Sequence, residues 1–77
     1  KLVRAHGVMR PMDEYVTEFG NIPDDAPRVE EDETLSVLIQ MAIDADATIV
    51  VRDSGAEVGV ITRRDILQTV IEGTEVS

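Results

Sequence analysis

The feature that most constrains this chain is the stretch Gly59–Leu67, in which a short apolar run passes directly into a helical pattern. The run is typical of a buried strand, and the residues after it repeat their apolar positions at helical spacing. The junction between the two carries a hydroxyl, two guanidinium groups and a carboxylate, on Thr62, Arg63, Arg64 and Asp65. We expect any ligand site of the chain to lie at this junction.

The chain is long enough for one small domain only. It has 77 residues, and a domain of this size buries only about 60% of the surface of its unfolded chain, so association with a partner should stabilise it. Tyr15 and Phe19 are the only aromatic residues, so the core must be aliphatic. The chain has no cysteine and a single histidine, His6. We therefore expect no disulfide scaffold and no metal site built on thiolates or histidines, and a reducing compartment fits.

Charge and missing motifs argue against several functions. The net charge of −9 repels nucleic acid and anionic lipid. No apolar run is long enough to span a bilayer, and we expect a cytoplasmic domain without direct membrane insertion. There is no phosphate loop of an ATPase, and one histidine in an arm does not support a Ser/His/Asp arrangement. We therefore expect a domain that is not an enzyme and requires no cofactor. Because the chain begins at Lys1, we expect it to be part of a longer protein.

Residues 1–27 are expected to form an N-terminal arm, a short helix and a connector. The first twelve residues show no sustained apolar period, and His6 should be exposed. Pro11 suits the first turn of the short helix, which Gly20 would end. The aromatic pair on this helix is expected to be a packing patch. The two prolines of the connector favour turns or extended backbone.

The core is expected over residues 28–73. A short strand, Arg28–Glu30, opens it and leads into the acidic run Glu30–Glu33. We interpret this run as a solvated surface at the start of a helix, with a metal site as the alternative. The following helix, Thr34–Asp44, has one apolar stripe and further apolar residues outside it. Such a helix on a small domain should bury two faces, one against the sheet and the other against a partner.

Two strand-like runs come next, Ala47–Val51 and Glu57–Ile61. The short turn Asp53–Gly55 between them predicts a hairpin. Gly59 lies inside the second strand. A glycine at such a position often marks a bulge, or a place where another backbone or a ligand comes close.

The second helix is expected over Arg63–Ile71, with a stop at Gly73 and a frayed tail over residues 74–77. The fold class is therefore α+β. The predicted order is strand, helix, strand, strand, helix after the arm, with two helices on one face of a small sheet.

Three segments together resemble CBS domains. Gly59–Leu67 matches the family signature of glycine, two apolar residues, Thr or Ser, two variable residues, Asp and an apolar residue. Val50–Gly55 resembles the family's second strand and its Asp-containing turn, and Val8–Pro11 is similar to its usual lead-in. The order of strands and helices is also that of the family, and the chain holds one motif.

This resemblance implies a partner, because CBS motifs work in pairs. The second motif would lie in the parent chain or be a second copy of this one, which predicts a two-fold homodimer. A narrower likeness, carried by Pro27–Val29 and the short tail, is to the C-terminal region of the ATPase subunit of osmoprotectant (glycine betaine/proline) ABC transporters. It implies a neighbouring transporter ATPase, a role in osmoregulation and a place at the inner face of the membrane.

The resemblance also implies a regulatory ligand such as AMP, ATP or S-adenosylmethionine. Asp65 would accept hydrogen bonds from ribose hydroxyls, Thr62 would contact ribose or phosphate, and Arg63 or Arg64 would pair with phosphate oxygens. The strand residues that would wall the adenine are Ile49, Val51 and Val60.

A purely structural interpretation of the same residues stays open. Thr62 and Asp65 have the spacing of a helix capping box, in which each side chain accepts a hydrogen bond from the other's backbone N–H. Such a cap is worth about 1 kcal/mol without any ligand. The function would then be that of a ligand-free module that dimerises and senses ionic strength through its charge.

Overall fold

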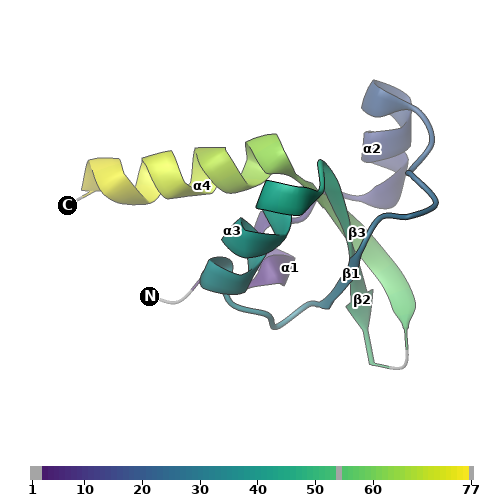
Figure 1. Cartoon of the computed structure of the whole chain (residues 1–77), viewed down its shortest axis with the longest axis horizontal. Helices are drawn as coiled ribbons and strands as arrows, with labels where there is room; N and C mark the ends of the chain where they lie inside the picture. The colour runs from purple at the N-terminus through teal and green to yellow at the C-terminus, as the bar shows by residue number, and fades with distance from the viewer. Residues whose placement is uncertain (1–2, 54, 77) are drawn as a thin grey trace.

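The computed structural model describes residues 3–53 and 55–76 (Figure 1). In chain order the elements are α1 (Ala5–Val8), α2 (Met12–Phe19), β1 (Arg28–Glu30), α3 (Leu35–Asp44), β2 (Ala47–Arg52), β3 (Ala56–Thr62) and α4 (Arg63–Val76). The predicted order of strand, helix, strand, strand, helix is confirmed by β1, α3, β2, β3 and α4. Two short helices precede it.

The three strands form one mixed sheet in the order β1-β2-β3. β1 runs parallel to β2, because α3 carries the chain back between them. β2 and β3 form the predicted antiparallel hairpin, with a register shift between Val50 and Val51. In its turn, Asp53 and Gly55 have φ angles of 51° and 106°, a region that favours Asp and Gly. Ser54, the middle residue of the predicted turn, lies outside the described residues.

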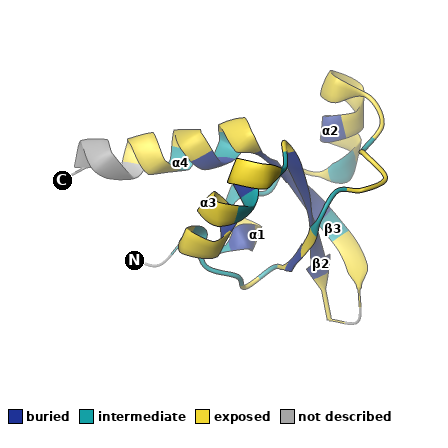
Figure 2. Ribbon diagram, viewed as in Figure 1, coloured by how far each residue is buried: buried dark blue, intermediate teal, exposed yellow. Residues whose placement is uncertain are grey.

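Helices cover both faces of the sheet. On one face, α1, α3 and α4 pack around a core of fully or nearly fully buried aliphatic residues that includes Leu38, Val50 and Ile61. On the other face, Tyr15 of α2 packs on Ala47 and Val60. Figures 1 and 2 show α2 on the opposite side of the buried strands from α3. Successive residues of β3 point to opposite faces of the sheet. Val60 therefore packs with Tyr15 of α2, and Ile61 packs in the core that α1, α3 and α4 cover.

The segment expected to be an arm is instead built into the fold. Ala5 is completely buried, and its N–H donates to the Glu33 carbonyl at 2.9 Å. Arg10 and Val60 exchange two backbone hydrogen bonds, each of 2.9 Å. The prediction of an irregular arm was wrong because these bonds join residues far apart in sequence, which local periodicity does not reveal. His6 is exposed, as predicted, and the first two residues lie outside the described part.

The last helix is longer than predicted. α4 continues through Gly73 to Val76, so the expected stop and tail are wrong over these residues, and Ser77 lies outside the described part. A glycine inside a helix costs only about 1 kcal/mol relative to alanine and does not end it without a competing cap. Among the described residues, no helix has both the length and the apolar character needed to cross a membrane.

Gly59 is the position where another backbone comes close, as predicted. A Cβ atom at Gly59 would lie 2.7 Å from the sulfur of Met9 and 2.9 Å from the Arg10 carbonyl oxygen. The missing side chain therefore lets the segment of Met9 and Arg10 run against β3.

Gly59→Ala is expected to destabilise the domain by about 1–3 kcal/mol, because the added methyl group must displace a backbone carbonyl as well as a side chain. Urea denaturation measures the loss. Gly7→Ala is the matched control, since a Cβ atom there meets nothing within 4 Å. Equal stability of the two variants would contradict the close approach.

Candidate functional site

Thr62 and Asp65 form the predicted capping box at the point where β3 passes into α4. The Thr62 N–H donates to Asp65 Oδ2 at 3.0 Å, and the Asp65 N–H donates to Thr62 Oγ1 at 3.1 Å. The two residues satisfy backbone donors that the first turn of a helix leaves without partners. The structural role of this pair is therefore confirmed.

Asp65 also binds Arg10, which sequence reasoning did not include in the site. Arg10 Nη2 donates to Asp65 Oδ1 at 2.6 Å and Arg10 Nε donates to Oδ2 at 3.1 Å, so the pair is bidentate. Arg10 Nη1 donates to Glu18 at 2.6 Å, and the guanidinium lies 5.4 Å from the ring centre of Phe19. The one signal in the sequence was the lead-in Val8–Pro11, which contains Arg10.

These contacts control the ionisation of both partners. Burial tends to raise the pKa of Asp65, but hydrogen bonds from Arg10 and from Thr62 outweigh it and leave the pKa below its ordinary value. The hydrogen bond to Asp65 is the main reason why the pKa of Arg10 is raised. Both side chains are shielded from solvent, at 19% exposed for Arg10 and 16% for Asp65. The two groups therefore form a stable ion pair at neutral pH.

A polar hollow of about 310 Å³ lies beside this pair. It is lined by Arg10, Glu18, Phe19, Arg64, Asp65 and Gln68. Two guanidinium groups can bind phosphate oxygens, the carboxylates can accept from hydroxyls, and an aromatic face can stack on a base. The hollow thus combines cationic, anionic and aromatic side chains.

The structure places only part of the predicted site at this hollow. Arg64 and Asp65 line it, and Thr62 is joined to Asp65. Arg63 points elsewhere, because its Nε donates to the Ala42 carbonyl at 2.7 Å and its Nη1 lies 3.0 Å from Asp46.

The three predicted wall residues do not line the polar hollow. Ile49 and Val51 are buried in the central strand β2, and Val60 is completely buried in the cluster with Tyr15 of α2. An adenine could reach Val60 only if α2 moved. The assignment of these residues to a binding site stays a prediction.

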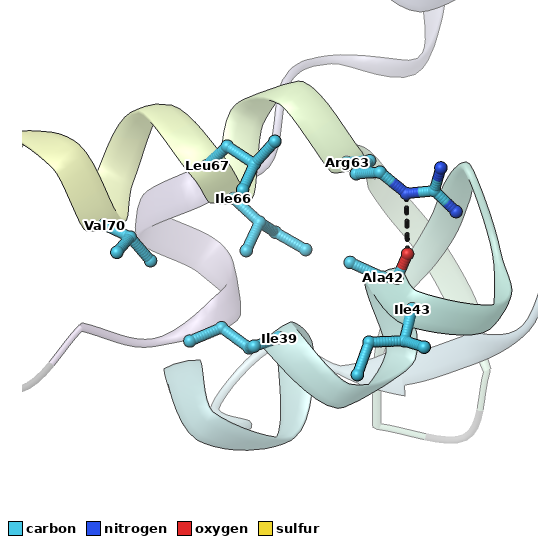
Figure 3. Close-up of a pocket in the computed structure, with 7 residues that line it drawn as sticks. All are labelled: Ile39, Ala42, Ile43, Arg63, Ile66, Leu67 and Val70. Carbon is cyan, nitrogen blue, oxygen red and sulfur yellow. Dashed lines mark hydrogen bonds between the residues drawn. The ribbon is translucent and has the colours of Figure 1, made fainter.

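A second hollow, the apolar groove, lies between α3 and α4 (Figure 3). It has a volume of about 300 Å³ and is lined by Ile39, Ala42, Ile43, Arg63, Ile66, Leu67 and Val70. Ile43 is 73% exposed and Leu67 is 55% exposed. The apolar excess predicted on the first core helix is therefore present at the surface.

Lowering the pH should weaken the fold through Asp65. Because the pKa of Asp65 is lower in the folded state, its contribution is complete above the unfolded value of about 3.9 and is lost as the pH falls through the folded pKa. The free energy of unfolding of Asp65→Asn should therefore fall less between about pH 5 and about pH 2 than that of the unmodified chain. Asp25→Asn, at an exposed position, is the control, and its free energy of unfolding should fall with pH as steeply as that of the unmodified chain. Identical slopes for the two variants would contradict this role of Asp65.

No protein-family model matches this chain, and no curated protein matches it. Several solved structures do match. A CBS domain-containing protein from Bacillus anthracis is 26% identical, with a TM-score of 0.59; the match covers 65% of this chain and 36% of that chain. A hypothetical conserved protein from Geobacillus kaustophilus is 12% identical, with a TM-score of 0.71, and the match covers 95% of this chain and 99% of that one.

The third structure is that of CBSX2 in complex with AMP. It is 13% identical, with a TM-score of 0.60, and the match covers 80% of this chain and 51% of that chain. This chain thus spans about a third of the first structure and half of the third. In this chain the order of β1, α3, β2, β3 and α4 is the one expected from the resemblance, and the signature lies at the β3–α4 junction. The chain has the CBS domain fold, a small α+β fold with a three-stranded mixed sheet.

Proposed function

We propose that this domain is a non-catalytic regulatory module that pairs with a second CBS-type domain and binds an adenosine nucleotide in the polar hollow. The observation that carries the proposal is the hollow itself, where the signature residue Asp65 lies beside Arg64 and Phe19. The AMP bound to CBSX2, a protein of the same fold, supports this ligand class.

Each group at the hollow has a defined task in this proposal. Asp65 accepts a hydrogen bond from a ribose hydroxyl. Arg64, which is exposed at the start of α4, pairs with phosphate oxygens. Phe19, at the end of α2, forms one wall of the hollow and is 49% exposed. Thr62 holds Asp65 in place through the capping box.

The charge of the hollow favours one phosphate over three. Its lining has two guanidinium groups, on Arg10 and Arg64, and two carboxylates, on Glu18 and Asp65. They balance one another, and the whole chain carries a net charge of −9. A triphosphate would add several negative charges to this surface without matching cations. We therefore expect AMP to bind more tightly than ATP.

The apolar groove provides the surface for pairing. Large aliphatic side chains of α3 and α4 are exposed there, and a domain this small gains stability by covering them. The chain has a single CBS motif, so the simplest partner is a second copy related by a two-fold axis. The partner would stack its own helices on this groove.

A second candidate function is a ligand-free dimerisation module that senses ionic strength. The observation that favours it is that Asp65 is already paired with Arg10, so the capping box is complete without a nucleotide. The acidic surface would respond to salt through screening, which acts over about 10 Å at 0.1 M. In either candidate function, the domain could control the ATPase of an osmoprotectant transporter. This more specific proposal depends on the sequence resemblance alone.

Calorimetry should detect binding of AMP to the chain and weaker binding of ATP. Asp65→Asn should weaken AMP binding by about tenfold, because a hydrogen bond to a charged acceptor contributes about 1.5–3 kcal/mol. Asp25→Asn serves again as the control. If AMP, ATP and S-adenosylmethionine all fail to bind at about millimolar concentration, where even a weak Kd would be visible, the nucleotide proposal is wrong.

Sedimentation should show a dimer that Leu67→Glu disrupts, because the new carboxylate would be buried in the apolar groove. Val16→Glu is the matched control, since Val16 is an exposed apolar residue on α2, outside the groove. The same measurement across salt concentrations tests the second candidate function, which expects the dimer affinity to change with salt. A monomer at all concentrations would contradict pairing through this groove.

A further inference from the structure

One side chain joins the proposed nucleotide site to the helix on the other face of the sheet. The guanidinium of Arg10 binds Asp65 at the start of α4, and it also binds Glu18 and lies against Phe19, both on α2. The backbone of Arg10 is fixed separately by its two hydrogen bonds with Val60. The side chain can therefore change partners while the chain around it stays in place.

The contacts of Asp65 leave little room for a ligand. A carboxylate offers about four lone-pair positions. Arg10 uses one on each oxygen, and the Thr62 N–H uses a second on Oδ2. One position on Oδ1 remains, whereas the two neighbouring hydroxyls of a ribose need two acceptors. A ribose that binds Asp65 with both hydroxyls must displace Arg10 from at least one oxygen.

Displacement of Arg10 would also loosen α2. Arg10 ties the end of this helix to the rest of the chain through the bond to Glu18 and the contact with the Phe19 ring. The helix is also attached through the small apolar cluster around Tyr15, with Met12 and Ile22. Movement of α2 is also what would expose Val60, one of the predicted wall residues.

We infer that Arg10 and an adenosine ligand compete for Asp65, so that the site is closed by Arg10 when empty and ligand binding releases α2. This inference deepens the proposed function and rests on it. It assigns the regulation of the site to a residue outside the signature. Because coupling is reciprocal, any partner that holds α2 in place weakens ligand binding, and the ligand weakens that partner's hold by the same factor.

The test compares Arg10→Gln with Arg64→Gln. Each variant removes one guanidinium, and so one positive charge, from the same hollow of an acidic chain, so simple electrostatics predicts weaker AMP binding in both. Competition predicts the opposite for Arg10: Arg10→Gln should bind AMP about tenfold more tightly than the unmodified chain. Arg64→Gln should bind no more tightly. Calorimetry with AMP supplies both dissociation constants.

Amide hydrogen exchange supplies a second readout. AMP should speed exchange in α2 of the unmodified chain, and in Arg10→Gln this exchange should be fast before AMP is added. Arg10→Lys keeps the charge of the hollow but cannot form the bidentate pair with both oxygens of Asp65, so it should also bind AMP more tightly than the unmodified chain. It decides the question if Arg10→Gln does not fold.

The outcomes separate the inference from the function on which it rests. If the unmodified chain binds AMP and Arg10→Gln, or Arg10→Lys in its place, binds it equally or more weakly, the competition is refuted while the nucleotide site stands. If neither the unmodified chain nor the variants bind AMP, the proposed ligand and the competition are both refuted.

Discussion

The close approach of Met9 and Arg10 to β3 is the contact on which the arrangement of this domain depends. It requires glycine at position 59, because any Cβ atom there would lie within 3 Å of the approaching backbone. Two backbone hydrogen bonds between Arg10 and Val60 then fix the segment along the strand. From this position the Arg10 side chain reaches Asp65. The ion pair at the start of α4 therefore depends on the absence of a side chain at Gly59.

The capping box and the ion pair act on the same carboxylate and support each other. The Thr62 N–H donates to Asp65 Oδ2 and orients the carboxylate, and Arg10 then binds both of its oxygens. A bidentate pair of this kind is stronger and more directional than a lysine contact would be. The signature stretch Gly59–Leu67 therefore contributes to stability at both ends, through the glycine and through the carboxylate. Its stabilising role explains why the motif alone does not establish a ligand.

The elements that sequence reasoning located correctly are those with local determinants. The hairpin follows from β-branched runs around a turn, α3 from its apolar period, and the cap from two side chains three positions apart. Arg10 was missed because its partner is 55 residues away in the sequence, and no periodic pattern links the two. The same reason explains the error over α1, whose single turn is held by backbone bonds to Glu31 and Glu33. Arg63 was assigned to the site by position, but its long side chain turns to the Ala42 carbonyl instead.

The distance in sequence between Arg10 and β3 has a consequence for how the domain folds. The hairpin and the helices beside it are made of contacts between near neighbours, which close quickly, whereas the pairing of Arg10 with Val60 must close most of the chain into one loop. We expect the N-terminal segment to dock last. Until it does, the outer edge of β3 presents unpaired backbone groups to other chains. The domain is therefore open to edge-to-edge aggregation until Arg10 pairs with Val60, and the same contact covers this part of the strand edge in the native fold.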